Sequence, residues 1–256
     1  MKSFKYNIIA LGLLGLAITS CKEPEYPTPT PATTPSTAQA FVMAHHFSAD
    51  APAVDVYLDN TKIATASYGD ILVNQAVYAP IPAGFRQIRL KATTQDTSVL
   101  VNRSNYATGT NWSVFVVDAF ATKRLSGVVI QDQFLTLAAG KVGLRFLNLS
   151  NDSRVSASTG VILANDSLGT SKIFNDQRVF KAVAFGSGSS AVQFNRYTSV
   201  DAYTSKKVYV LKNDAAKTFV SSFVLNTVAG QSYTLALVGT GNSGAKALDL
   251  KLIRNK

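Results

Sequence analysis

The chain has 256 residues, 46% of them hydrophobic and 16% charged, and a formal net charge of +10. This composition excludes a disordered chain and is sufficient to bury the core of one large domain or of two ordinary ones. Most of the excess positive charge lies after residue 139, and the two glutamates, Glu23 and Glu25, both lie near the N-terminus. Carboxylate chemistry in the rest of the chain would therefore depend on aspartate.

Residues 1–20 have the pattern of a secretory signal peptide. Two lysines precede an apolar run over residues 8–18, and prolines follow it closely. A helix over this run would be only about 16 Å long, whereas the hydrocarbon core of a membrane is about 30 Å thick. We therefore expect this segment to be cleaved rather than to span the membrane.

Residues 18–21, Ile-Thr-Ser-Cys, resemble the lipobox of bacterial lipoproteins. The resemblance implies that Cys21, the only cysteine of the chain, becomes the first residue of the mature protein and carries a diacylglycerol thioether. Its freed amine is commonly acylated as well, and two or three acyl chains make a stable membrane anchor. The alternative is a free thiol in an ordinary signal peptide. Once Cys21 is acylated, the mature chain can form no disulfide.

Residues 21–39 are rich in Pro, Thr, Ala and Ser and show no periodic apolar face. Such a segment favours extended polyproline II structure at about 3.1 Å per residue, so its eighteen residues after Cys21 would reach up to roughly 55 Å. We interpret it as a linker that holds a domain away from a surface. Glu23 and Glu25 resemble the short acidic tags that send some lipoproteins to the outer face of the outer membrane. We therefore expect a lipid anchor in the cell envelope, at the outer membrane.

Two units of similar pattern follow the linker, which we place at residues 40–138 and 139–256. Short motifs recur in the same order in both: Phe47–Asp50 and Leu149–Asp152, Val56–Asn60 and Val161–Asn165, Tyr68–Asp70 and Phe174–Asp176, Gly109–Val114 and Gly230–Leu235. The separation between equivalent motifs grows from 102 residues at the first pair to 121 at the last. We expect the extra length of the second unit between Tyr197 and Phe219.

Each unit has the pattern of short β-strands. Apolar residues alternate with polar ones over residues 54–58, the sequence Asp59-Asn60 is typical of a turn, and similar runs recur at intervals near ten residues. After the signal segment, no stretch shows helical spacing. The pattern predicts an all-β protein with two tandem immunoglobulin-like antiparallel β-sandwiches of about seven strands each.

Residues 48–60, SADAPAVDVYLDN, are similar to the opening strand and turn of a bacterial family, domain of unknown function 4397. The Pro-Ala-Gly sequence at residues 82–84 resembles the turn that precedes that family's next strand. The family occurs in secreted and lipid-anchored proteins, so the resemblance implies a β-sandwich and an envelope location, but no activity. The second unit departs from the pattern, with Ser-Arg-Val-Ser at residues 153–156 and no Pro-Ala-Gly turn, so a role of Asp55 does not transfer to it.

His45 and His46 are the only histidines. Neighbouring residues of a strand point to opposite faces, so this pair cannot chelate a metal from one regular strand. His46 aligns with Asn148, and we expect both side chains to hydrogen-bond backbone at a strand end. The sequence predicts no metal site and no cofactor.

Enzyme motifs are also missing from the sequence. A Ser-His-Asp hydrolase would need one of the two histidines, and the Gly-Ser-Gly sequence at residues 186–188 is typical of a flexible turn rather than a nucleophile elbow. The aspartates lie beside turn-forming residues, which explains them without a glycosidase pair. Asp50, Asp55 and Asp59 suggest calcium, but the segment lacks the acidic density of a calcium loop. We expect no catalytic activity.

The basic second unit offers the candidate contact surface. Cations accompany aromatic side chains there: Lys206, Lys207, Lys212, Lys217, Tyr203 and Tyr209. Such residues would bind an acidic polysaccharide or lipopolysaccharide phosphates. The alternative is a solvated edge strand that lysines protect from aggregation. No nucleic-acid-binding motif is present.

Together these patterns predict a lipid-anchored envelope protein with a non-catalytic role in binding, adhesion or assembly. The alternative is an accessory binder of acidic glycans in a polysaccharide-uptake system. The sequence leaves the partner and the oligomeric state open.

Overall fold

The structure is a computed structural model, and it describes residues 38–49, 51–69, 78–95, 98–117, 125–150, 161–170, 197–212, 215–239 and 247–256. These residues form fifteen β-strands and no helix, so no membrane-spanning helix occurs among them. Residues 36–256 make up one compact unit. The predicted all-β fold class is confirmed, whereas the signal segment and Cys21 lie outside the described residues.

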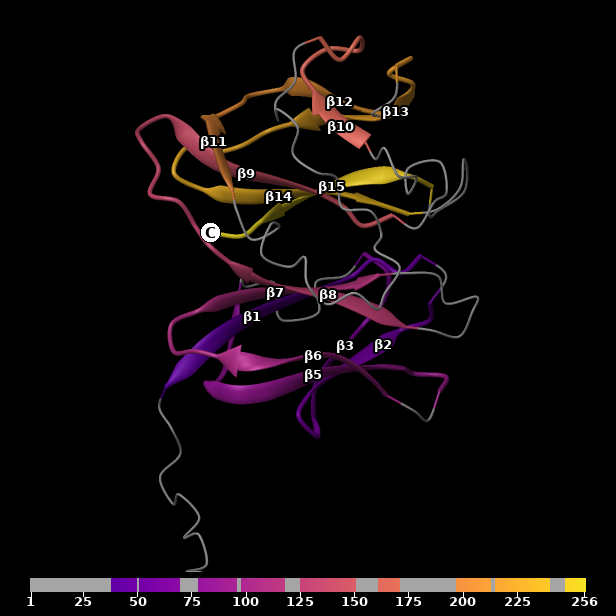
Figure 1. Ribbon diagram of the computed structural model, residues 1–256, viewed down its shortest axis with the longest axis vertical. Helices are drawn as coiled ribbons and strands as arrows, with labels where there is room; N and C mark the ends of the chain where they lie inside the picture. The colour runs from indigo at the N-terminus through magenta and orange to yellow at the C-terminus, as the bar shows by residue number, and fades with distance from the viewer. Residues whose placement is uncertain are drawn as a thin grey trace, which may run out of the picture. The chain divides into compact units, whose positions relative to one another are not determined.

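Two four-stranded sheets form the first sandwich (Figure 1). One sheet has the strand order β4-β1-β7-β8 and the other has the order β3-β2-β5-β6. Only β1 and β7 pair in parallel in these sheets. The strands are β1 (Gln39–His46), β2 (Val54–Leu58), β3 (Thr61–Ala66), β4 (Ala79–Pro82), β5 (Gly84–Ala92), β6 (Val99–Tyr106), β7 (Asn111–Val117) and β8 (Ser126–Asp132).

The core of the first sandwich follows from the alternation along its strands. On β2, Val54 and Val56 point into the core, as do Ile88 and Leu90 on β5, and all four side chains are fully buried. Trp112 packs across the same core. Successive side chains of a strand alternate between faces, so the residues between these positions lie on the outer face of the sheet.

The second sandwich repeats this arrangement with sheets of order β11-β9-β14-β15 and β10-β12-β13. Here β9 and β14 form the parallel pair, and the other pairs are antiparallel. The strands are β9 (Lys141–Asn148), β10 (Val161–Ala164), β11 (Thr198–Asp201), β12 (Lys206–Lys212), β13 (Phe219–Leu225), β14 (Ser232–Val238) and β15 (Asp249–Arg254).

The two sandwiches have equivalent registers in their central parallel pairs. Phe41 lies opposite Asn111 in the first sandwich, and Gly143 lies opposite Ser232 in the second. Gly143 follows Phe41 by 102 residues and Ser232 follows Asn111 by 121 residues, the same separations as between the first and the last pair of sequence motifs. Gly109 N–H donates to the Gln39 carbonyl at 2.7 Å, and Gly230 N–H donates to the Lys141 carbonyl at 2.8 Å. Both glycines have positive φ, 76° and 83°, a conformation that glycine adopts without a Cβ clash.

The extra length of the second sandwich lies earlier than expected. Pro82 of β4 lies opposite Gln39, and Asp201 of β11 lies opposite Lys141, so Asp201 is the equivalent of Pro82. These two positions are 119 residues apart, so most of the extra length of the second sandwich precedes Asp201. The expectation that the extra length falls between Tyr197 and Phe219 is therefore wrong. The sequence comparison had no matching motif between residues 176 and 230 that would have located it.

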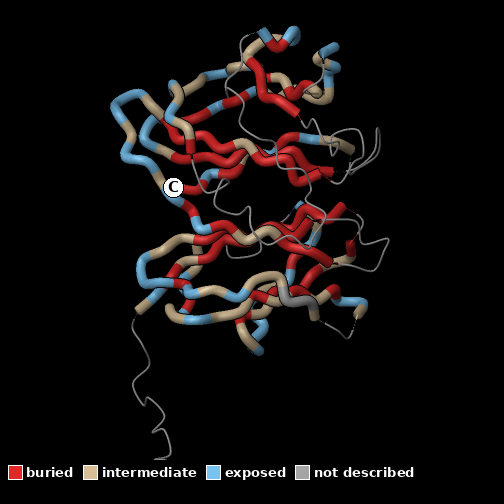
Figure 2. The backbone as a smooth tube through the Cα atoms, viewed as in Figure 1, coloured by how far each residue is buried: buried red, intermediate tan, exposed pale blue. Residues whose placement is uncertain are grey.

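A third apolar cluster joins the two sandwiches. It contains Phe47 and Phe115 from the first sandwich and Leu147, Ala236 and Ile253 from the second. The sheets that carry β7 and β14 are therefore covered on both faces, and these strands are buried along almost their whole length (Figure 2). Burial on both faces explains why their sequences are continuous apolar runs rather than alternating ones.

Candidate functional site

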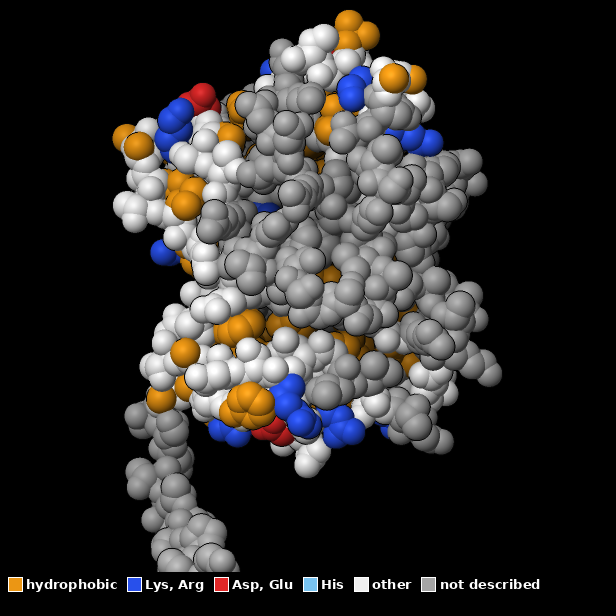
Figure 3. Space-filling view, in the orientation of Figure 1, with side chains coloured by type: hydrophobic (Ala, Val, Ile, Leu, Met, Phe, Trp, Pro, Cys, Tyr) orange, Lys and Arg blue, Asp and Glu red, His pale blue; other side chains and the backbone are white. Residues whose placement is uncertain are grey.

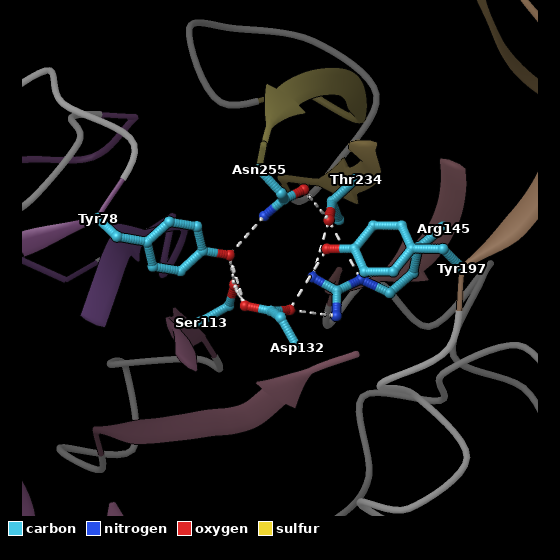
Figure 4. A network of polar contacts seen from close by, with 7 residues as sticks. All are labelled: Tyr78, Ser113, Asp132, Arg145, Tyr197, Thr234 and Asn255. Carbon is cyan, nitrogen blue, oxygen red and sulfur yellow. Dashed lines mark hydrogen bonds and ion pairs between the residues drawn. The ribbon is translucent and has the colours of Figure 1, made fainter. Parts of the chain in front are cut away.

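A buried polar network lies where the two sandwiches meet (Figure 4). The first sandwich contributes side chains next to β4 and from β7 and β8, and the second contributes side chains from β9 and β14 and next to β11 and β15. Its members are Tyr78, Ser113, Asp132, Arg145, Tyr197, Thr234 and Asn255. We call this set the interface network.

An ion pair between the sandwiches forms the centre of the interface network. Arg145 Nη1 donates to Asp132 Oδ1 at 2.7 Å, and the exposed fractions of the two side chains are 2% and 0%. The other carboxylate oxygen, Oδ2, accepts hydrogen bonds from Tyr78 Oη at 2.6 Å and from Ser113 Oγ at 2.7 Å. Both oxygens of Asp132 therefore have close donors, which a buried charge requires.

The Arg145 guanidinium is held on the side of the second sandwich. Its Nε and Nη2 donate to Thr234 Oγ1 at 3.1 and 2.8 Å, and it lies 4.6 Å from the ring centroid of Tyr197. Thr234 donates to Asn255 Oδ1 at 2.6 Å, and Asn255 Nδ2 donates back to Tyr78 Oη at 3.4 Å. The contacts form a closed circuit that crosses the boundary between the sandwiches.

Both tyrosines of the interface network stay neutral hydrogen-bond donors. Burial raises the pKa of Tyr78 and Tyr197 far above the usual range, and the neighbouring Asp132 carboxylate raises both further. Tyr197 Oη also reaches Asp132 Oδ1 at 3.4 Å. Because its members bond to one another in a solvent-excluded place, the interface network is suited to holding the sandwiches together rather than to acting on a substrate.

Sequence reasoning missed the interface network. Asp132 and Arg145 lie in different units, and nothing local connects them. The one available signal was Arg145 itself, a charged residue inside the otherwise apolar run of residues 142–147. A cation in a strand that enters a core needs a buried partner.

The two histidines have separate structural surroundings. His46 Nδ1 accepts a hydrogen bond from Ser48 N–H at 3.2 Å, and Asn148 Oδ1 accepts one from Ser150 N–H at 3.2 Å, so the predicted backbone contacts at the strand ends are confirmed. His45 is 2% exposed, and its ring stacks on Phe47 and Phe115 at centroid distances of 5.6 and 5.8 Å.

Burial gives His45 an unusual acid–base character. It lowers the pKa of the imidazole from 6.5 to about 4. Within the described part of the chain, Nε2 of His45 has no hydrogen-bond partner. The ring is therefore neutral at neutral pH and acts as one layer of an aromatic stack.

The aspartates considered for calcium are paired with cations. Asp55 contacts Lys62 Nζ at 2.8 Å and Thr65 Oγ1 at 2.5 Å. Burial alone would raise the pKa of Asp55, but these hydrogen bonds and the lysine charge hold it below the usual value. Asp59 contacts Arg86 Nη1 at 3.3 Å, and Asp50 lies outside the described residues. Among the described ranges, no group of His, Cys, Asp and Glu residues is arranged to hold a metal.

The structure does not gather the lysines and tyrosines of the second unit in one place. Lys206 and Lys212 lie at the two ends of β12, about 20 Å apart along an extended strand. Tyr203 packs against the core of the sandwich, and Lys217 lies between β12 and β13 with a φ of 49°. β12 is also the middle strand of its sheet, so the interpretation of these lysines as protection of an edge strand is wrong for β12.

Lys207 and Tyr209 are the two members that the structure brings together. They are separated by one residue on β12 and share the outer face of the sheet. The Lys207 Nζ lies 5.4 Å from the Tyr209 ring centroid, a cation–π arrangement.

Comparisons with known proteins give a family for part of the chain. Residues 40–155 match a family described as a domain of unknown function (DUF4397), and this match spans the first sandwich and β9. None of the curated proteins compared with the sequence matches it.

A solved structure from Bacteroides uniformis, described as a "putative cell adhesion protein", is similar over 87% of this chain and 100% of its own. The two sequences are 10% identical and the TM-score is 0.18. A likeness at this level does not establish a common fold.

Proposed function

We propose that the chain is a lipid-anchored, non-catalytic binding protein of the cell envelope, with a role in adhesion or assembly. The interface network is the observation that supports this proposal most. It uses a buried ion pair and its hydrogen-bonding neighbours to fix one sandwich against the other, and the outer face of sheet β3-β2-β5-β6, where Phe85 and Arg103 are exposed, is available for contact with a partner. We further propose that residues 139–256 are a divergent second copy of the unit at residues 40–138, which lies within the family match at residues 40–155.

Acylation of Cys21 is the proposed means of attachment. Replacement Cys21→Ser removes the only thiol and should release the protein from the membrane fraction and abolish its labelling by a fatty acid. Retention of the serine variant in the membrane fraction without label would contradict the lipid anchor.

The adhesive role is tested on intact cells. Cells that carry the wild-type chain should attach to other cells or to a coated surface more strongly than cells that secrete equal amounts of the Cys21→Ser variant. Equal attachment of the two strains would show that the anchored protein does not support adhesion.

Binding of acidic glycans is the second candidate function. The neighbouring cation and ring of Lys207 and Tyr209 favour it at the second sandwich. Cations and aromatic rings also share the outer face of sheet β3-β2-β5-β6 in the first sandwich.

A further inference from the structure

The outer face of sheet β3-β2-β5-β6 gathers cations and aromatic rings. Because Val54 and Val56 of β2 enter the core, Tyr57 lies on the opposite face. The same alternation on β5 places the side chains of residues 85, 87, 89 and 91 on that outer face. We call the following set the basic face: Asp55, Tyr57, Lys62, Phe85, Gln87, Arg89, Lys91 and Arg103.

Strand register brings these side chains together although they are distant in sequence. Tyr57 lies directly opposite Lys62 of β3 and Arg89 of β5, so a ring is flanked by two cations across three strands. One step along, Gln87 lies opposite Arg103 of β6. Side chains that are directly opposite across strands have Cβ atoms about 5 Å apart.

The basic face has a clear excess of positive charge. It carries four cations and a single carboxylate, Asp55, which is already paired with Lys62. Figure 3 shows Lys and Arg side chains beside exposed hydrophobic side chains over this sheet, at the lower end of the view. Phe85 is 68% exposed and adds an apolar ring to this charged face.

The arginines are positioned but not saturated. Arg89 Nη1 donates to Asn60 Oδ1 at 3.2 Å, and Arg103 Nη2 donates to Gln87 Oε1 at 3.1 Å. Each guanidinium has five N–H donors, so the one bond found for it among the described residues leaves donors for a further partner. Such groups are suited to binding carboxylates or sulfates in bidentate fashion.

We propose that the basic face binds an anionic polysaccharide built of uronic acids or sulfated sugars. This names the partner chemistry of the proposed binding function and does not depend on the lipid anchor. The cations match the acidic groups, and Tyr57 and Phe85, about 13 Å apart along the strand direction, offer apolar surfaces for sugar rings of an extended polymer.

The polar side chains of the basic face suit the hydroxyl groups of a sugar polymer. The Asp55 carboxylate and the Gln87 side-chain oxygen already accept hydrogen bonds within the face, and each oxygen has more than one acceptor site, so sugar hydroxyls can donate to them as well. A DNA backbone has no hydroxyl donor for these sites, whereas every residue of a uronic-acid polymer carries hydroxyls.

The test measures retention of the full chain on immobilised polygalacturonate, with neutral dextran, a 20-nucleotide oligo-dT and phosphatidylglycerol vesicles as alternative probes. Two variants change the basic face: Arg89→Glu/Arg103→Glu reverses charge, and Phe85→Ala removes a ring without changing charge. Lys251→Glu/Arg254→Glu is the matched control, because it changes the net charge equally at two exposed positions of β15 on the second sandwich, outside both candidate glycan surfaces.

The proposal predicts binding to polygalacturonate and not to dextran. The Arg89→Glu/Arg103→Glu affinity should fall about tenfold or more, and Phe85→Ala should weaken binding about threefold with an unchanged salt dependence. The control should change affinity less than about twofold.

Three results would overturn the proposal: no retention by polygalacturonate, an equal loss in both charge-reversed variants, or tighter binding of oligo-dT or vesicles that the same substitutions abolish. Loss of the control variant's binding alone would place the glycan site on the second sandwich. Failure of the membrane-fraction experiment with Cys21→Ser leaves these outcomes unaffected, so the two proposals fail separately.

Discussion

His45 should make the stability of the protein depend on pH. Burial in the stack with Phe47 and Phe115 lowers its pKa from 6.5 to about 4, so the unfolded chain binds a proton at this site more readily than the folded one. The stabilisation is complete above pH 6.5 and is lost as the pH falls towards 4. At 1.36 kcal/mol per pKa unit, the free energy of unfolding should drop by roughly 3 kcal/mol over this range because of His45.

The assay is urea unfolding at pH 7, 5.5 and 4, followed by far-ultraviolet circular dichroism and by fluorescence of Trp112. The variant His45→Phe keeps an aromatic ring in the stack but cannot be protonated. Its stability relative to wild type should rise by roughly 3 kcal/mol between pH 7 and pH 4. The comparison within each pH removes the contribution of other titrating groups.

His46→Asn is the matched control. Asn148 makes the equivalent backbone hydrogen bond in the second sandwich, so asparagine at position 46 should keep the contact to Ser48, and His45→Phe should bring the same pH-dependent gain in this background. If the difference between His45→Phe and wild type is the same at all three pH values, His45 is not the buried neutral group described above.

The remaining predictions concern the interface network and the paired glycine turns. Arg145→Met leaves the Asp132 carboxylate buried without its cation and should lower the free energy of unfolding by about 3–5 kcal/mol, and adding Asp132→Asn should restore part of the loss in the denaturant midpoint. Lys141→Met breaks an exposed pair of the same 2.7 Å length and should cost less than about 1 kcal/mol, so an equal cost for the two would refute the importance of burial. Gly230→Ala places a Cβ in open space but at a φ of 83°, and thermal unfolding should show a loss of about 1 kcal/mol; no loss would mean that the turn differs from the one described.

The parts of the fold that the sequence predicts are those with local causes. Alternation over residues 54–58 places Val54 and Val56 in a core, and this holds because the side-chain period of a strand is two. The turn glycines Gly109 and Gly230 and the contacts of His46 and Asn148 are also short-range features, which is why comparison of the two halves locates them.

The interface between the sandwiches could not be predicted in the same way. The continuous apolar run of β7 indicates burial on both faces but does not say what covers the second face. The pairing of Asp132 with Arg145 depends on how two separately patterned units dock, and no periodicity within either unit encodes it.

The basic face could not be predicted from the amino-acid composition of the first unit. Lysines and arginines balance aspartates over residues 40–138, so the net charge of the segment suggests no anion-binding surface. The strand order β3-β2-β5-β6 brings Lys62, Arg89 and Arg103 to one face, while Asp132 is buried at the interface. Net charge counts residues and cannot show which of them share a surface.

Calorimetry of the full chain tests most directly whether the interface network makes one body of the two sandwiches. Wild type should unfold in a single transition for residues 36–256, and Arg145→Met should separate it into two transitions or broaden it strongly. Two independent transitions in the wild-type protein, unchanged by Arg145→Met, would contradict the role assigned to the Asp132–Arg145 pair and the account of the protein as a rigid binding unit.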